Sequence, residues 1–138
     1  MTKLKLTNDT DLILARTGQL PQGLVRSVEI DALVDAGATM LVLPQDVVEQ
    51  LGLTIRGLRR VRYADGRVAA IPWVAGLSIE ILGREMGCEA LVEAAGTVPL
   101  IGQIPLEALD LLVDPKTRDL HVNPASPDLP LLDLLAVG

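Results

Sequence analysis

The feature that most constrains the fold of this chain is an alternation of polar and apolar residues with a period of two. It is seen at Leu4 and Leu6, from Val25 to Ile30, at Val61 and Tyr63, and from Leu77 to Ile81. Successive side chains of a β-strand point to opposite faces of a sheet, so this alternation is typical of half-buried strands. Turn sequences separate the strands, among them Asp65-Gly66, Gly83-Arg84 and Asp114-Pro115. The sequence therefore predicts many short strands joined by tight turns.

Only two segments carry helix signals, and both are short. The first begins at Pro44 and ends before Gly52, and the second begins at Pro105 and reaches Leu109. Proline suits the first turn of a helix, and glycine suits the position after its end. Many short strands with two small helices predict a mostly β fold of the barrel or sandwich type.

The length of 138 residues fits one domain, and 49% hydrophobic residues are enough to build a core. We expect the domain to cover residues 1–122 and a tail rich in proline and leucine to cover residues 123–138. Three prolines lie in that tail, and the apolar run Leu131–Leu135 follows them. We expect this run to dock its leucines on a surface of the domain.

Composition excludes several classes of function. A single cysteine, Cys88, excludes an internal disulfide and a cysteine-based zinc site, and a single histidine, His121, excludes a histidine cluster. We therefore expect no metal and no cofactor, and we interpret Cys88, His121 and the single tryptophan, Trp73, as structural. The net charge of −6 and the scarcity of aromatic residues argue against a nucleic-acid partner.

The hydropathy of the chain argues against a membrane partner. No apolar run approaches the roughly 20 residues that span a bilayer. The first residues, Met1 to Leu6, lack the apolar core of a signal peptide. We therefore expect a cytoplasmic protein.

One segment stands out as a candidate site. Asp35 follows the apolar residues Ala32 to Val34 and begins a turn of small residues, Ala36 to Thr39, after which a second apolar strand leaves. Small residues let backbone N–H groups and a second chain approach a carboxylate closely. Taken alone, an Asp-x-Gly turn is more typical of an aspartate that stabilises its own turn through a side-chain hydrogen bond.

Two further segments change this interpretation. A hairpin from Arg60 to Ile71 has a tip from Ala64 to Arg67, and the apolar pair Leu100-Ile101 precedes a glycine just ahead of the second helix. With the Asp35 turn and a long second hairpin across Gly83, these segments resemble the retropepsin-like aspartic proteases, single-domain relatives of the retroviral protease. The sequence closely resembles the bacterial members of this family. It covers residues 24–122, with all parts in the same order.

The resemblance implies a closed, barrel-like retropepsin fold that works as an obligate two-fold dimer. Aspartic proteolysis needs two carboxylates that share one proton, because like charges about 3 Å apart cannot both ionise cheaply. This chain has one Asp-x-Gly turn, so the resemblance places the second carboxylate on Asp35 of another copy. The implied function is a homodimeric aspartic endopeptidase that activates water with this dyad and hydrolyses polypeptides.

The resemblance also assigns roles to the remaining site residues. Asp35 is the catalytic residue, and the active-site loop continues through Ala36, Gly37, Ala38 and Thr39. The flap that closes over substrate has its tip at Ala64, Asp65, Gly66 and Arg67, and the active-site loop is supported from below by Leu100, Ile101 and Gly102. Family members have Thr or Ser after the aspartate, where the hydroxyl bonds across the two-fold axis. Ala36 cannot make this bond, which implies a weakened activity.

Two alternatives remain at the level of the sequence. One is a non-catalytic dimer of the same fold that binds peptides or serves as a scaffold. The other is a small β-barrel in which the Asp35 turn is purely structural. The distance between the two Asp35 carboxylates separates the dyad from both alternatives.

Overall fold

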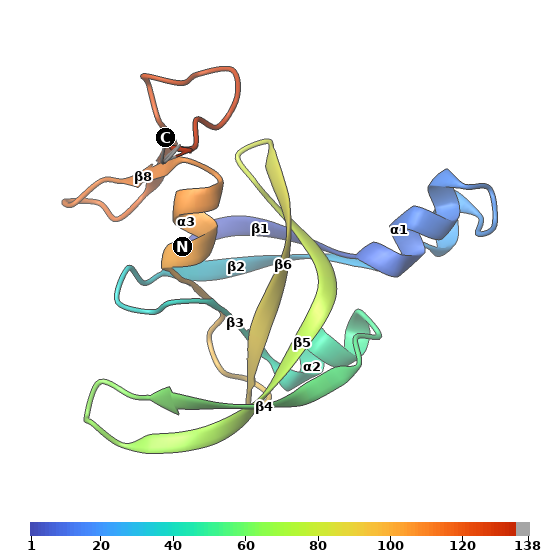
Figure 1. Ribbon diagram of the computed structural model, residues 1–138, viewed down its shortest axis with the longest axis horizontal. Helices are drawn as coiled ribbons and strands as arrows, with labels where there is room; N and C mark the ends of the chain where they lie inside the picture. The colour runs from blue at the N-terminus through green and yellow to red at the C-terminus, as the bar shows by residue number, and fades with distance from the viewer. Residues whose placement is uncertain (135–138) are drawn as a thin grey trace.

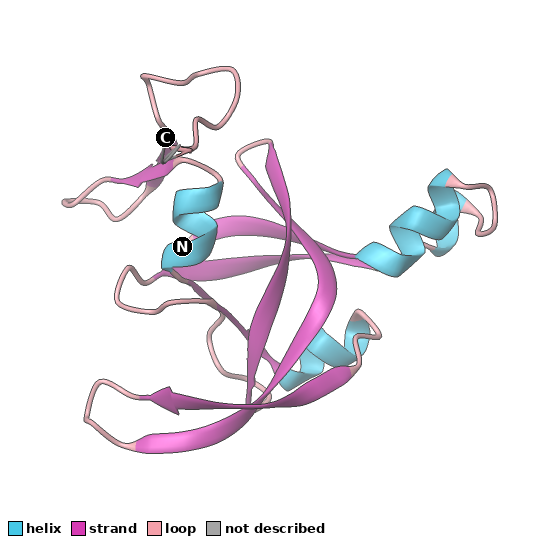
Figure 2. Ribbon diagram, viewed as in Figure 1, coloured by secondary structure: helices cyan, strands magenta, loops and turns pink. Residues whose placement is uncertain are grey.

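The computed structural model describes residues 1–134 of the chain, and strands dominate it (Figures 1 and 2). The strands are β1 (Thr2–Asn8), β2 (Ser27–Val34), β3 (Leu41–Pro44), β4 (Ile55–Arg62), β5 (Val68–Ile81), β6 (Arg84–Glu93), β7 (Leu100–Ile101), β8 (Leu111–Val113) and β9 (Leu120–Val122). The helices are α1 (Asp9–Arg16), α2 (Gln45–Gln50), α3 (Gln103–Ala108) and the 3-10 helix η1 (Gln22–Leu24).

Seven of the strands form one sheet that closes on itself. Their order is β1-β2-β7-β3-β6-β5-β4, and β1 also pairs with β5, so six strands form a ring. Strand β4 lies outside the ring and pairs with β5 as the outer strand of a long hairpin. The mostly β fold predicted from the alternation is confirmed, and its closed sheet is consistent with the retropepsin-like fold.

The core inside the ring is built from aliphatic side chains. Its fully buried members include Leu4, Leu6, Leu41, Leu43, Leu77, Ile79, Ile81 and Ile101. In β1 the leucines point inward while Lys3 and Lys5 are exposed, as the alternation predicts. Burying such a side chain contributes roughly 1.5–3 kcal/mol, so period-two patterning determines which face of each strand lies against the core.

Helix α1 was not predicted. Asn8 caps its first turn by accepting a hydrogen bond from the N–H of Asp11 (3.0 Å). The Asp11 carboxylate in turn accepts hydrogen bonds from the Arg26 guanidinium (2.7 and 3.0 Å) and the Arg26 N–H (3.0 Å). These bonds lower the pKa of Asp11, and they attach the helix to the segment that enters β2. The apolar residues of α1 are contiguous rather than spaced with a helical period, which hid the helix in the sequence.

The two predicted helices are present with shifted beginnings. Pro44 is the N-cap of α2 rather than its first helical residue, and α3 begins at Gln103, two residues before Pro105. None of the helices in residues 1–134 is long and apolar enough to cross a membrane.

The predicted docking of the tail leucines is wrong for the part of the tail that the structure describes. Leu129, Leu131, Leu132 and Leu134 are 60–92% exposed. Polar bonds hold this segment instead: the Asp110 carboxylate accepts hydrogen bonds from Ser126 Oγ, Asn123 Nδ2 and the N–H of Leu131. These bonds lower the pKa of Asp110 to about 2. Residue 135, the last leucine of the predicted run, lies outside the described residues, and the division of the chain at residue 122 stays a prediction.

Candidate active site

Asp35 lies in the loop between β2 and β3, and backbone bonds hold it there. Its N–H donates to the carbonyl of Ile101 (3.0 Å), and its carbonyl accepts from the N–H of Ala38 (3.1 Å). Its side-chain Oδ1 accepts from the N–H of Gly37 (2.9 Å). Asp35 is half-buried, and Ala36 and Gly37 beside it are exposed. The loop therefore presents a carboxylate in a defined orientation at the surface.

Strand β7 and the residues after it lie beneath this loop. Leu100 and Ile101 pair in parallel with the last two residues of β2, and Leu100 pairs with Val42 of β3 on its other side. The N–H groups of Gln103 and Ile104 donate to the carbonyls of Ala38 (2.8 Å) and Thr39 (2.9 Å). The segment from Leu100 to Gly102 and the two residues after it therefore lie directly against the loop from Asp35 to Thr39.

Gly102 makes the closest approach in this support. A Cβ atom at this position would lie 2.3 Å from the carbonyl oxygen of Met40 and 2.8 Å from that of Ala38. Distances under 3 Å between a Cβ and backbone atoms are not tolerated, so the loop backbone can rest on β7 only where residue 102 has no side chain. The same contact explains why a glycine follows the apolar pair Leu100-Ile101 in the sequence.

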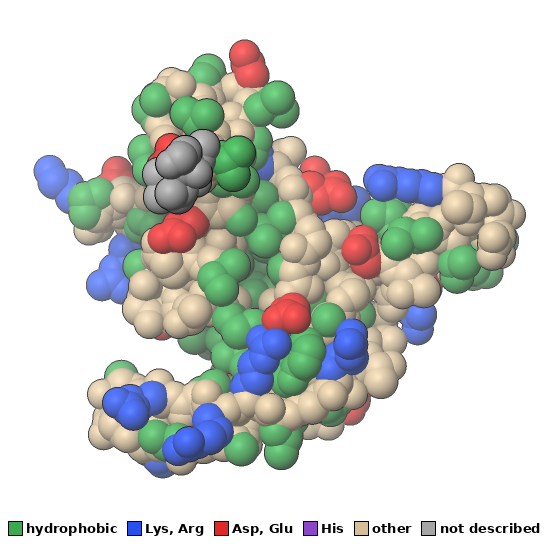
Figure 3. Space-filling view, viewed as in Figure 1, with side chains coloured by type: hydrophobic (Ala, Val, Ile, Leu, Met, Phe, Trp, Pro, Cys, Tyr) green, Lys and Arg blue, Asp and Glu red, His purple; other side chains and the backbone are tan. Residues whose placement is uncertain are grey.

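The hairpin of β4 and β5 reaches out beside the active-site loop. Its tip, Ala64 to Arg67, is exposed and is closed by two hydrogen bonds: the Tyr63 N–H donates to the Arg67 carbonyl (2.8 Å), and the Gly66 N–H donates to the Tyr63 carbonyl (2.9 Å). Gly66 has a φ of 86°, which only glycine adopts readily. The hairpin and the active-site loop lie on the same side of the molecule, and the surface is hollowed between them (Figures 1 and 3).

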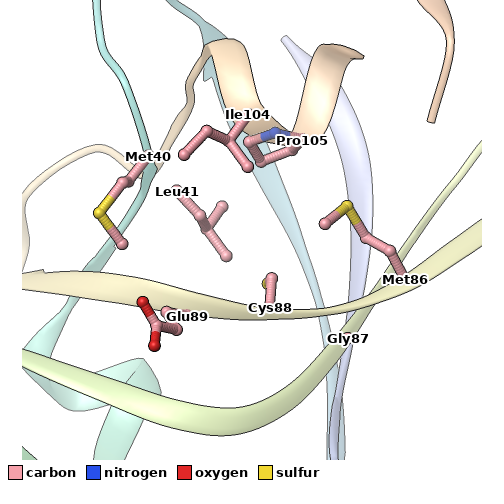
Figure 4. A pocket seen from close by; sticks show the side chains of 8 residues that line it. All are labelled: Met40, Leu41, Met86, Gly87, Cys88, Glu89, Ile104 and Pro105. Atoms are coloured by element: carbon pink, nitrogen blue, oxygen red, sulfur yellow. The ribbon is translucent and has the colours of Figure 1, made fainter. Parts of the chain in front are cut away.

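An apolar cavity of about 220 Å³ adjoins the active-site loop (Figure 4). Met40 and Ile104 line it from the loop and α3, and Met86 and Cys88 line it from β6. Burial raises the pKa of the Cys88 thiol to about 12, so this thiol is protonated near neutral pH and is no nucleophile. A second, more open hollow is lined by Ala36, residues of α3 and β8, and Leu131 and Leu132 of the tail.

Sequence reasoning missed the side chains that connect the hairpin to the rest of the site. Arg59 forms an ion pair with Glu89 of β6 (2.8 Å), and Tyr63 donates a hydrogen bond to Glu93 (2.6 Å). The alternation along β4 placed Val61 and Tyr63 on one face, and extending it to Arg59 would have put all three there. The alternation does not show which element this face of β4 contacts, because that contact depends on how the sheet closes.

Other candidate chemistry is sparse in this part of the chain. Within residues 1–134 no group of three or more His, Cys, Asp or Glu side chains is placed to hold a metal ion. His121 is exposed and lies 3.9 Å from the Asp114 carboxylate. Neither residue belongs to the loop or the hairpin described above.

Comparison with known proteins supports the family suggested by these segments. Residues 22–108 match a family model described as "gag-polyprotein putative aspartyl protease". No curated protein matches the chain. The matched segment is more than half of the chain and contains the Asp35 loop, the β4–β5 hairpin and the Gly102 support. The chain therefore belongs to the retropepsin-like aspartyl protease family.

Proposed function

We propose that this protein is a homodimeric aspartic endopeptidase whose dyad consists of Asp35 from each of two copies. The observation that carries the proposal is the half-buried Asp35 carboxylate, set on a loop that rests on Gly102. Only a backbone N–H, that of Gly37, bonds to this carboxylate within the described residues. The second oxygen is thereby left for water, substrate or a second carboxyl group.

A second copy is required because the site holds one carboxyl group. The loop from Ala36 to Met40 contains no other carboxylate, and neither does the supporting segment from Val98 to Leu106. Two copies related by a two-fold axis that passes beside the active-site loops would bring one Asp35 from each together. Both Ala36 and Gly37 are exposed, and the methyl group of Ala36 and the missing side chain of Gly37 permit the close approach that such an axis needs.

The proposed chemistry follows from two carboxyl groups that share one proton. The ionised group accepts a proton from a water between them, and that water attacks the scissile carbonyl carbon. The protonated group donates its proton to the carbonyl oxygen, so a neutral tetrahedral diol forms and no covalent enzyme intermediate is needed. In the collapse of the diol, the carboxyl group that is now protonated gives its proton to the leaving nitrogen, and the ionised one accepts the proton of a diol hydroxyl. The C–N bond breaks and that hydroxyl oxygen becomes the carbonyl of the new carboxyl group. The β4–β5 hairpin would act as the flap that excludes bulk water during these steps.

The decisive variant is Asp35→Asn, which keeps the shape of the side chain and its hydrogen bond from Gly37 but removes the acid. We expect it to remain dimeric in sedimentation velocity and to lose hydrolysis of a peptide library measured by mass spectrometry. Asp46→Asn, in the exposed first turn of α2, is the matched control and should keep its activity, because it removes a carboxylate that lies outside both the Asp35 loop and the hairpin. Hydrolysis by purified Asp35→Asn above a few percent of wild type would place the chemistry elsewhere.

Ala36 favours one second candidate function, a dimer that binds peptides without cleaving them. A methyl group beside the proposed axis cannot make the hydroxyl bond that the family uses there, so the two loops would be held less firmly. This candidate predicts that wild type and Asp35→Asn bind the same peptides equally and that neither cleaves them.

A further inference from the structure

The β4–β5 hairpin carries a charge opposite to that of the rest of the protein. Residues 55–74 contain one carboxylate, Asp65, and five arginines, at positions 56, 59, 60, 62 and 67. The segment therefore has a net charge of +4, whereas the whole chain has −6, which leaves −10 on the remainder. Figure 3 shows these cationic side chains gathered on the hairpin, which borders the hollow beside the active-site loop.

The arginines divide between the two faces of the hairpin. Arg60 and Arg62 are exposed, and they pair across the hairpin with Ala70 and Val68. Arg59 lies on the other face, where its side chain is 35% exposed. Within residues 1–134, neither Arg60 nor Arg62 has an ion-pair partner.

Arg59 is held at the point where the hairpin meets the active-site loop. Its Nη1 lies 2.8 Å from Glu89 Oε1 and 3.4 Å from the sulfur of Met40, the residue just before β3. Its guanidinium carbon lies 3.9 Å from the centroid of the Trp73 ring. Stacking on an aromatic face and a charged hydrogen bond together restrain the plane of a guanidinium. Arg59 is therefore ordered before any substrate arrives.

The other nitrogens of Arg59 remain able to donate. No acceptor among the described residues bonds to Nε or Nη2, although a guanidinium carries five N–H groups in a fixed fork. Arg56 stacks on the same Trp73 ring at 5.5 Å. Two guanidiniums therefore lie at the Trp73 ring, and Glu89 is paired with Arg59 alone, which leaves a net positive charge at this corner. The free Nε and Nη2 groups of Arg59 could donate two parallel hydrogen bonds to the carboxylate of a ligand.

We propose that Arg59 makes this protein select polypeptides with an acidic side chain in the segment that lies between the hairpin and the active-site loop. The inference rests on the proposed function, because it assigns the substrate class of that same site. The acidic surface of the rest of the protein would repel an acidic peptide, so only the cationic hairpin would attract it. An aspartate or glutamate beside the apolar cavity under Met40 and Ile104 would bind here with its carboxylate toward Arg59.

The test compares two peptides that differ by a single Glu-to-Gln change, at each position around a scissile bond. At pH 5.5 and low salt, wild type should hydrolyse the best Glu peptide about three- to tenfold faster in kcat/KM than its Gln counterpart, the range of a partly exposed charged contact. The Arg59→Gln variant should lose this preference. Arg60→Gln is the matched control, since it removes the same charge from the same strand on the opposite face, and it should keep the preference.

Three results would overturn the proposal. The first is that wild type shows no preference for the Glu peptide, and the second is that Arg59→Gln keeps this preference. The third is that Arg59→Gln and Arg60→Gln lose the preference equally, which would assign it to the overall positive charge of the hairpin. Arg59→Lys keeps the charge but not the fork, and it should restore less than half of the preference. Thermal unfolding of each variant shows whether the hairpin is still folded.

A binding measurement separates this proposal from the proposed function. Fluorescence anisotropy of the labelled Glu and Gln peptides with Asp35→Asn reports recognition without hydrolysis. Tighter binding of the Glu peptide, with no cleavage by wild type, would refute the protease and support the role of Arg59. Equal binding and equal cleavage of both peptides would refute the role of Arg59 and leave the protease in place.

Discussion

Replacing Gly102 by alanine tests whether the active-site loop depends on its support. The added Cβ would lie 2.3 Å from the Met40 carbonyl oxygen and 2.8 Å from both the Ala38 carbonyl oxygen and the Met40 nitrogen. All three neighbours are backbone atoms, which cannot rotate away as the end of a flexible side chain can. The loop must therefore move away from β7 by about 1 Å to restore ordinary contact distances.

The magnitude follows from what this movement breaks. Overpacking of this kind costs about 1–3 kcal/mol. The hydrogen bonds from Gln103 to Ala38 (2.8 Å) and from Ile104 to Thr39 (2.9 Å) cross the same contact, and each contributes about 0.5–1.5 kcal/mol. We expect Gly102→Ala to lower the free energy of unfolding by about 2–6 kcal/mol and to abolish activity by displacing Asp35.

Urea unfolding followed by far-UV circular dichroism measures this loss. Gly23→Ala is the matched control, because its Cβ would meet no atom within 4 Å and its backbone is not left-handed. It should change the free energy of unfolding by less than about 0.5 kcal/mol. A similarly small effect of Gly102→Ala, or full activity in that variant, would refute the close approach of the loop to its support.

Three further predictions follow from other parts of the molecule. The pKa of Asp110 is lowered to about 2 in the fold, so its ionised carboxylate stabilises the fold fully above the unfolded pKa of about 3.9, and this effect is lost as the pH falls toward 2. Limited proteolysis should therefore show the tail released between pH 5 and pH 2. The Asp110→Asn variant should release the tail at every pH. Cys88, with its pKa raised to about 12 by burial, should react with iodoacetamide at pH 8 at least tenfold more slowly than in the urea-unfolded chain, and equal rates would contradict its burial. Ala36→Thr should lower the dissociation constant of the proposed dimer about five- to hundredfold, because each copy would add one hydroxyl bond across the proposed axis; sedimentation equilibrium that shows weaker association would refute this argument.

The sequence predicted those parts of the fold that depend on local patterning. Strand positions follow from alternation because one side of each strand is buried, as Leu4 and Leu6 show. The Asp35 turn and the glycine at position 102 were also recognisable, because segments whose backbones approach closely need small residues, and these residues are visible in the sequence. The order of the strands did not follow from their patterns, because the pairing of β1 with β5 joins segments about seventy residues apart.

Features decided by tertiary contacts could not be predicted in this way. Helix α1 is stabilised by Asn8 at its cap and by the bonds from Arg26 to Asp11 rather than by an apolar stripe, so its residues carried no helical period. The tail was expected to dock through leucines, but polar bonds to Asp110 hold it. Arg59 was missed because its importance comes from Trp73, Glu89 and Met40, which three separate segments bring together.

The proposed dyad is tested most directly by the distance between the two Asp35 carboxylates in a crystal structure of the protein at its optimum pH. We predict a two-fold dimer with facing carboxyl oxygens about 3 Å apart, the separation at which two carboxyl groups share a proton. A monomer, or a dimer in which these oxygens lie about 8 Å or more apart and thus beyond hydrogen-bond reach, would contradict the proposed protease.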